Sequence, residues 1–249
     1  MSGHSKWSTI KHKKAAADAK RGKVFTQITK ELTVSAREGG GDPETNVRLR
    51  LAIDKAKAVN MPKDNIERAI KRGTGELEGG VLEEVLYEGY GPYGVGVLVE
   101  TVTDNRNRAI AEVRHAFSKQ GGNTASAGSV VWQFTRMGYI GVDGEFDSDD
   151  LFLIAADAGA DDVRFEGDVA EVYTGIDNLQ DVRNAIEQAG YSMAEVSVIY
   201  DPNNPVALTT AESLQVMRLI ESLEELDDVQ NVYSSLELSD EAIAAMEAA

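Results

Sequence analysis

Cysteine is absent from the sequence, which excludes a disulfide framework, a thiolate metal site and a cysteine nucleophile. A chain without cysteine suits a reducing compartment, so we expect a cytoplasmic protein. Histidine is nearly as scarce. His4, His12 and His115 are too few and too scattered for a zinc site, and we expect no metal and no cofactor. No stretch approaches the roughly 18 apolar residues of a membrane span, and the charged start from Lys6 onward lacks the apolar core of a signal peptide.

The length and composition that remain are those of a folded protein. The chain has 249 residues, of which 42% are hydrophobic and 27% are charged. This is enough for two or three domains with cores of their own, and it argues against wholesale disorder.

Charge is divided unevenly along the chain. Residues 1–75 hold 17 of the 25 Lys and Arg but only 8 of the 42 Asp and Glu, a net charge of +9. The remainder carries a net charge of −26, which brings the whole chain to −17. We call residues 1–75 the basic head and the remainder the acidic body. The acidic body would repel phosphates, whereas the basic head would attract them. For the acidic stretch from Glu221 onward we favour a solubilising role.

Apolar spacing predicts three helices in the head. The first runs from Phe25 to the glycines at 39–41, the second lies around residues 49–56, and the third runs from Pro62 to Gly73. Residues 6–23 instead scatter basic side chains round the helix axis and offer little apolar surface to bury. We therefore expect these residues to form an arm that gains order by docking on something negative.

Beyond the head, short β-branched runs alternate with helical patterns. We expect a hairpin over residues 85–99, a helix over 105–119, a βαββαβ series over 130–200, and then a helix over 211–223 and a strand over 229–236. The βαββαβ order is that of a ferredoxin-like domain. The flanking elements would form a discontinuous middle domain around it.

The predicted fold class is therefore α+β, with an N-terminal helical domain and two α/β domains, one of them ferredoxin-like and inserted into the other. The predicted domains are residues 1–79, residues 80–129 together with 206–240, residues 130–205, and an acidic tail at 241–249.

Patterns typical of enzymes are weak in this chain. Residues 89–94 match G-x-G-x-x-G, but a strand rather than a helix is expected to follow, so a hairpin turn is favoured over a dinucleotide site. The acidic cluster at Asp147, Asp149 and Asp150 precedes a helix and is explained by N-capping. No pair of carboxylates stands out, and we assign no catalytic residue.

Basic residues offer a stronger indication of function. Arg68, Lys71 and Arg72 fall in one sector of the third predicted helix, opposite its apolar side. A secondary basic face is predicted on the helix over 105–119, from Arg108, His115 and Lys119. Such surfaces bind phosphates by releasing counterions, irrespective of base sequence, and no motif for reading bases is evident.

The chain also resembles the YebC/PmpR family. The motifs that carry the resemblance extend from residue 3 to about residue 240: Gly3-His-Ser-Lys-Trp7, Ile10-Lys-His12, Asp18-Ala-Lys-Arg-Gly-Lys23, Glu31-Leu-Thr33, Gly39-Gly-Gly-Asp-Pro43, Asn60-Met-Pro-Lys-Asp-Asn-Ile66, Arg68-Ala-Ile70, Tyr87-Glu-Gly-Tyr-Gly-Pro92, Thr103-Asp-Asn-Arg-Asn-Arg108 and Val113-Arg-His-Ala-Phe117. One departure is Tyr93, which stands where the family usually has a small residue.

The resemblance implies a three-domain protein without enzymatic activity. It implies a probable transcriptional regulator that binds promoter DNA, or a translation factor that binds ribosomal RNA on the ribosome and relieves stalling at proline-rich stretches. It implies neither a membrane nor a small-molecule substrate as partner.

Residue chemistry and resemblance together predict a nucleic-acid-binding regulator of gene expression. The helical face of Arg68, Lys71 and Arg72 would extend a footprint made by the arm, where Trp7 and His12 could stack on bases; Trp7 serves equally well as a hydrophobic anchor. The phosphate-contacting residues expected in the arm are Lys6, Lys11, Lys13, Lys14, Lys20, Arg21 and Lys23.

Two other functions stay open on the sequence. The first is a protein-interaction module whose basic head docks on an acidic partner while the ferredoxin-like unit supplies a sheet surface. The second is a hydrolase that uses acids in a cleft between domains.

Overall fold

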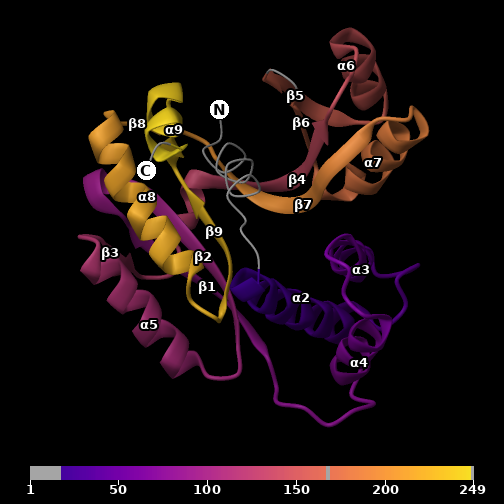
Figure 1. Cartoon of the computed structure of the whole chain (residues 1–249), viewed down its shortest axis with the longest axis horizontal. Coiled ribbons are helices and arrows are strands. Elements are labelled where there is room, and N and C mark those ends of the chain that lie inside the picture. Colours follow the sequence, from indigo (N-terminus) through magenta and orange to yellow (C-terminus); the bar gives the residue numbers. More distant parts are fainter. Residues whose placement is uncertain (1–17, 167–168, 248–249) are drawn as a thin grey trace. The chain divides into compact units, whose positions relative to one another are not determined.

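The computed structural model describes residues 18–166 and 169–247 (Figure 1). These residues form two compact units. The first contains the described residues up to Phe134 together with those from Pro202 onward, and the second is Thr135–Asp201. None of the helices in the described part of the chain is long and apolar enough to cross a membrane.

Three helices form the basic head, as the apolar spacing predicts. They are α2 (Asp18–Gly39), α3 (Val47–Ala58) and α4 (Lys63–Gly73), and Pro62 occupies the position just before α4. Their apolar stripes meet in one core that includes Leu32, Leu49 and Ala52. Asn46 caps α3 by accepting the Leu49 N–H, and its amide donates to the carbonyl groups of Ser35 and Gly40.

The start of α2 corrects the predicted arm. Residues 18–23 were expected to belong to a separate arm, but they form the first turns of α2 and continue without a break into the predicted helix. The physical reason is that extending a helix adds a hydrogen bond per residue, whereas starting a new one is costly. Neither a proline nor a glycine pair interrupts the chain between Asp18 and Phe25.

The middle domain is built on a four-stranded sheet with the order β3-β1-β2-β9. Strands β1 (Glu83–Tyr90) and β2 (Gly96–Thr103) form the predicted antiparallel hairpin. Strand β3 (Asn123–Ala125) pairs with β1, and β9 (Val229–Ser234) pairs with β2. The sheet therefore joins segments from both sides of the second unit, as expected of a discontinuous domain.

Helices pack against this sheet and enclose its core. Helices α5 (Arg106–Lys119) and α8 (Thr210–Glu224) contribute Phe117 and Leu219 to a cluster that also contains Val97 and Val99 of β2. Two short strands, β8 (Val206–Ala207) and β10 (Leu236–Glu237), pair in parallel beside it.

The expected acidic tail differs from the prediction. Residues 240–247 form α9 (Asp240–Glu247), whose Ala242 and Met246 are buried in the core of the middle domain. The sequence showed the acids but not the apolar face between them, because eight residues are too few to establish a helical period. The predicted domain boundaries themselves remain predictions.

The second unit has the predicted βαββαβ order. Its elements are β4 (Phe134–Asp143), α6 (Ser148–Asp157), β5 (Ala160–Glu166), β6 (Val169–Thr174), α7 (Leu179–Gln188) and β7 (Ser192–Pro202). The strand order β5-β6-β4-β7 places the first and third strands of the unit at its centre, as in a ferredoxin-like sheet. The first strand begins at Phe134 rather than at Val130, because a 3-10 turn over Val131–Gln133 precedes it.

The chain leaves the middle domain and returns to it at neighbouring points. The Asn203 backbone N–H donates to the Gln133 carbonyl over 2.8 Å, and its side-chain amide donates to the Trp132 carbonyl over 3.2 Å. Two hydrogen bonds therefore close the middle domain where the second unit is inserted.

The helical head is joined to the middle domain along one face of α2. Lys23, Gln27 and Lys30 lie at i, i+4 and i+7 and donate to carbonyl groups around the turn between α8 and β9. The acceptors are Glu224 at the end of α8, Val229 at the start of β9 and Asp227 in the turn, respectively. These contacts fix the helix against the turn.

A buried carboxylate completes this joint. Lys30 Nζ lies 2.7 Å from Asp228 Oδ1, while Arg108 Nη2 and Thr103 Oγ1 donate to Asp228 Oδ2 over 2.7 and 2.8 Å. Burial acts to raise the pKa of Asp228, but the hydrogen bonds from Lys30, Arg108 and Thr103 outweigh it, and the pKa lies below its ordinary value. The ionised carboxylate therefore stabilises the fold.

Replacing this carboxylate tests the joint. We expect Asp228→Asn to lower the free energy of unfolding by about 2 kcal/mol at neutral pH, because two cations are deprived of their shared partner. Since the folded pKa is depressed, the stabilisation is present above the ordinary pKa of about 4 and disappears as the pH falls through the folded value. Urea denaturation at pH 7, 4 and 3 should show wild type and variant converging in acid.

Asp227→Asn is the matched control, because the neighbouring Asp227 is exposed and joins the contact through its carbonyl oxygen. Equal decreases of stability in the two variants would contradict the assigned role of Asp228.

Candidate nucleic-acid interface

The predicted basic face on α4 is present and exposed. Ile66 and Ala69 are buried on one side of the helix, and Arg68, Lys71 and Arg72 are exposed at i, i+3 and i+4 on the other. Lys71 and Arg72 stand in the last turn, where a positive charge also complements the helix dipole. We call Arg68, Lys71 and Arg72 the α4 basic face.

These three cations differ from the other basic residues of the head. Eight further Lys and Arg side chains are described between residues 22 and 75, and each has a polar partner. Lys55, Lys57 and Lys63 pair with acids on neighbouring turns or helices, and Arg48 pairs with Glu38 and Glu84. The remaining four donate to backbone carbonyl groups: Lys23, Lys30, Arg37 and Arg50.

The α4 basic face forms no ion pair or side-chain hydrogen bond with any residue that the structure describes. Cations in this state keep their full charge for a partner from outside. This is the arrangement expected of a phosphate-contacting surface.

A close helix approach holds the α4 basic face in place. A Cβ atom on Gly73 would lie 2.3 Å from the Thr33 carbonyl oxygen and 2.8 Å from the Ala36 Cβ, both on α2. The Thr33 hydroxyl donates to the Ala69 carbonyl over 3.2 Å. The end of α4 is thus pressed onto α2, and glycine is the residue that this approach allows.

The predicted arm residues are placed only in part. Lys20 and Arg21 stand in the first turns of α2, and Lys23 donates to the Glu224 carbonyl over 2.5 Å, so Lys23 serves the joint with the middle domain. The remaining predicted contacts lie outside the described residues: Lys6, Trp7, Lys11, His12, Lys13 and Lys14.

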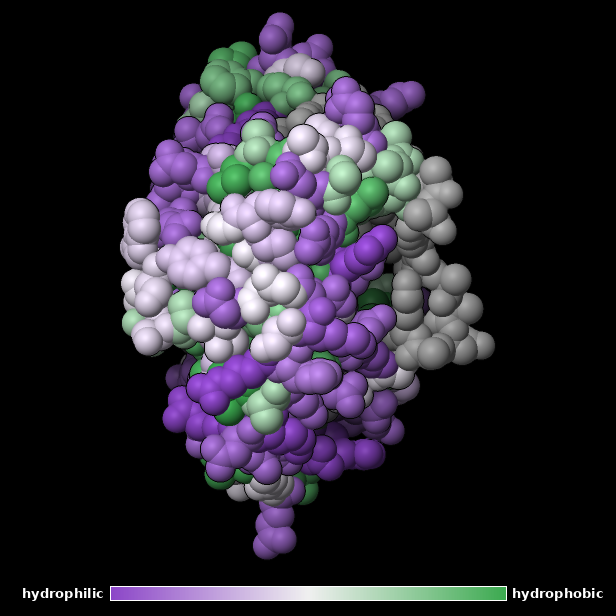
Figure 2. All heavy atoms as spheres, turned by 90° about the vertical axis from the view of Figure 1, so that its left-hand side faces the viewer, coloured by the Kyte–Doolittle hydropathy of each residue, from purple (hydrophilic) through white to green (hydrophobic). Residues whose placement is uncertain are grey.

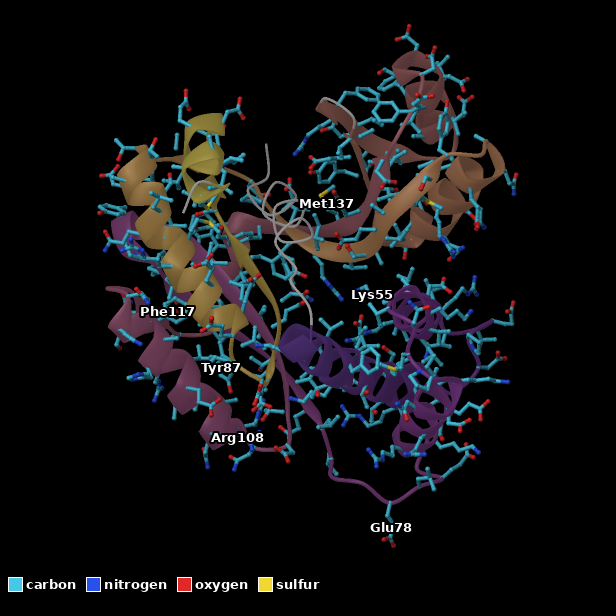
Figure 3. The ribbon with its side chains drawn as sticks, in the orientation of Figure 1. Lys55, Glu78, Tyr87, Arg108, Phe117 and Met137 are labelled. Carbon is cyan, nitrogen blue, oxygen red and sulfur yellow. The ribbon has the colours of Figure 1, made fainter. Side chains whose placement is uncertain are left out.

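The three residues of the predicted secondary basic face on α5 do not share one role. His115 and Lys119 are exposed, with Val113 and Phe117 buried on the opposite side of the helix. Arg108, on the first turn of α5, also reaches the surface (Figure 3). Its guanidinium pairs with Asp104 and Asp228, which raises its pKa. Its charge is largely compensated, so Arg108 acts mainly in the joint with α2.

The glycine-rich segment 89–94 is a hairpin turn, as expected. The 3-10 turn Pro92–Gly94 leads directly into β2, so no helix N-terminus is available for a pyrophosphate. Tyr93 adopts φ 62° and ψ 16°, a left-handed conformation that favours glycine, and the residue is 49% exposed.

The sequence did not predict a loop that is hydrogen-bonded to a buried carboxylate and carries an exposed tryptophan. Glu88 is buried and accepts the backbone N–H groups of Gly128, Val130 and Val131 over 2.6 to 2.8 Å. Burial acts to raise the pKa of Glu88, but the three N–H donors outweigh it and the pKa is lowered. The loop so held carries Trp132, which is 67% exposed. Neither spacing nor composition signals this contact, because it joins residues about 40 positions apart.

Other candidate chemistry finds no support in the geometry. Asp147 accepts the backbone N–H groups of Asp149 and Asp150 and caps α6, as predicted. Within residues 18–166 and 169–247, no group of three acidic or histidine side chains is placed to hold a metal ion.

Sequence comparison identifies the family. Residues 5–76 match the profile described as "TACO1/YebC protein N-terminal domain", and residues 82–236 match "TACO1/YebC second and third domain". The chain belongs to the TACO1/YebC family. The resemblance to YebC proteins that the sequence motifs indicated is thereby confirmed.

Relatives match along their whole length. A protein of Desulfatibacillum aliphaticivorans is 58% identical over 98% of this chain and 99% of its own, and one of Acidithiobacillus ferrooxidans is 56% identical over 100% and 99%. Both TACO1/YebC relatives are named "Probable transcriptional regulatory protein". The crystal structure of a conserved hypothetical protein from Aquifex aeolicus is 45% identical, covers 93% of this chain and 96% of its own, and superposes with a TM-score of 0.85. The α+β fold, with a three-helix domain and two mixed α/β domains, is that of the family.

The close approach of α4 to α2 can be tested at Gly73. We expect Gly73→Ala to lower the free energy of unfolding by about 1–3 kcal/mol, because the added methyl group overlaps the α2 backbone. Gly80→Ala is the control, since nothing lies within 4 Å of a Cβ at that position and its backbone is not left-handed. Thermal unfolding of wild type and both variants measures the difference. If Gly73→Ala were as stable as Gly80→Ala, the assigned role of Gly73 would be wrong.

Proposed function

We propose that the protein is a non-enzymatic regulator of gene expression that binds nucleic acid through its basic head. The observation that carries this proposal is the α4 basic face, where three adjacent exposed cations lack side-chain partners among the described residues, while the other eight Lys and Arg between residues 22 and 75 are engaged. A helix presenting three cations without described partners in one sector suits a partner that carries a row of phosphates.

The partition of charge supports the same function. The net charge of +9 on residues 1–75 and of −26 on the rest would orient the protein on a polyanion with the head inward. Binding would gain free energy by displacing counterions, and affinity would fall steeply with salt. The arm, with Lys6, Lys11, Lys13 and Lys14, would enlarge the footprint.

The names of the relatives favour DNA as the partner, and with it a role in transcription. The action proposed for this cytoplasmic protein is occupancy of a site, and it requires neither a cofactor nor a small-molecule substrate. Promoter DNA and ribosomal RNA present phosphates at similar density, so the target has to be identified in cells. Crosslinking in growing cells, followed by sequencing of bound DNA and bound RNA, should give discrete promoter peaks; enrichment of ribosomal RNA would assign the protein to translation instead.

Neutralising the α4 basic face tests the interface. We expect the triple variant Arg68→Gln, Lys71→Gln, Arg72→Gln to bind a 30-base-pair duplex about tenfold more weakly at about 100 mM salt. The slope of log affinity against log salt should fall by about 1 for each phosphate that the variant no longer neutralises. Filter binding across a salt series measures both quantities.

A matched control removes the same charge elsewhere on the head. The triple variant Lys55→Gln, Lys57→Gln, Lys63→Gln neutralises three surface lysines that have acidic neighbours. It should keep its affinity within about twofold, because those cations are already compensated. If both triple variants weaken binding equally, affinity follows net charge and the α4 basic face has no special role.

A further inference from the structure

A second group of free cations lies outside the head, where α5 ends beside α8. Of the eight Lys and Arg beyond residue 75, four form no ion pair or hydrogen bond through their side chains with described residues: Arg114, Lys119, Arg136 and Arg218. Three of these four stand on α5 and α8. In an acidic body, free cations gathered on two neighbouring helices are unexpected, and they point to a partner of negative charge.

Polar contacts connect α8 to Tyr93 and to the end of α5. The Tyr93 hydroxyl donates to Gln215 Oε1 over 2.7 Å, and a Cβ on Gly121 would lie 3.8 Å from Gln215 Nε2, so Gln215 of α8 links the hairpin turn to the end of α5. Gln120 donates to the Ser222 hydroxyl over 3.0 Å, one turn along α8 from Arg218. We call Tyr93, Lys119, Gln215 and Arg218 the α5–α8 seam.

The seam lies on an open, polar face. Lys119, Gln215 and Arg218 are exposed, and Tyr93 is 49% exposed. Figure 2 views the molecule from the side of α5 and α8 and shows a face covered mainly by hydrophilic residues. A half-exposed aromatic ring beside two free cations is therefore accessible to a large ligand.

The backbone at Tyr93 adds an independent observation. Among the described residues, Asn60 and Tyr93 are the two non-glycine residues with positive φ. Asparagine tolerates this conformation, whereas tyrosine is strained in it. A glycine would relieve the strain, so the position holds an aromatic ring at a conformational cost, and the Gln215 hydrogen bond fixes the direction of that ring.

We propose that the α5–α8 seam binds a single-stranded stretch of nucleic acid, with the Tyr93 ring stacked on one base and Lys119 and Arg218 on the flanking phosphates. The proposal rests on the proposed function, since it adds a second contact to a nucleic-acid-binding protein. A single strand is favoured over a duplex because a surface aromatic ring needs an unstacked base face. Gln215 acts as a positioning residue for Tyr93.

Tyr93→Gly removes the ring and its hydrogen bond to Gln215 without straining the backbone, because glycine adopts φ 62° freely. We expect it to weaken binding of a fluorescein-labelled oligouridine 20-mer about tenfold, the decrease expected of one stacked base. Binding of a 20-base-pair duplex should stay within about twofold, because a duplex offers no unstacked base. Tyr93→Phe keeps the ring and should retain most of the single-strand affinity. Fluorescence anisotropy measures binding, and thermal unfolding confirms that neither variant is less stable than wild type.

Salt separates the two kinds of contact within the seam. The weakening caused by Tyr93→Gly should be constant across a salt series, because stacking releases no counterions. The weakening caused by Lys119→Gln with Arg218→Gln should shrink as salt rises. Photocrosslinking of 4-thiouridine-labelled RNA should place a crosslink on the peptide that contains Tyr93.

The outcomes distinguish the seam from the α4 basic face. If wild type binds neither probe, both proposals fall. If neutralising the α4 basic face weakens binding while Tyr93→Gly leaves single-strand affinity unchanged, the seam proposal alone is overturned. If Tyr93→Gly weakens single-strand binding and the α4 variant does not, the seam stands and the α4 interface falls. Equal weakening by Tyr93→Gly on single strand and duplex would also overturn the seam, since stacking on an unpaired base would not explain it.

Discussion

The Asp228 carboxylate is the contact through which the basic head and the middle domain become one structure. It accepts from Lys30 on α2 and from Arg108 and Thr103 on the middle-domain side, and it is itself buried. Without this anion the ammonium and guanidinium groups would repel each other at the joint. One buried acid of the negative body therefore pairs with a lysine of α2, and it acts together with the hydrogen bonds from Lys23 and Gln27 to orient that helix.

This joint explains which cations remain for a partner. The head carries many bases, but folding engages most of those that are described, in ion pairs with acids or in hydrogen bonds to carbonyl groups. Lys23 and Lys30 are used in the contact with the α8–β9 turn. The α4 basic face escapes this use because burial of Ile66 and Ala69 and the close approach at Gly73 turn its side chains outward. Free charge on the surface is therefore a product of packing as well as of composition.

Most helices and strands could be predicted from the sequence, but few of the contacts between them could. Regular apolar spacing located α3, α4, α5 and α8, and turn signals located the hairpin, because these patterns are local. The start of α2 was misplaced because helix extension needs no apolar stripe, and α9 was missed because its buried face is short.

For the site, the exposed face of Arg68, Lys71 and Arg72 followed from helical geometry alone. The use of Arg108 in an ion pair with Asp228, the loop held by Glu88 and the meeting of Tyr93 with Gln215 depend on residues 40 to 122 positions apart. No local pattern encodes such pairings.

The hydrogen bonds between Asn203 and the segment Trp132-Gln133 bear on how the protein could have been assembled. They bring together the two points at which the chain leaves and re-enters the middle domain, outside the sheet of that domain. The ferredoxin-like unit is therefore an insertion that contributes no strand to the sheet of the middle domain. Substitutions inside the ferredoxin-like unit therefore leave the strand pairing of the middle domain, and the attachment of the basic head to it, intact.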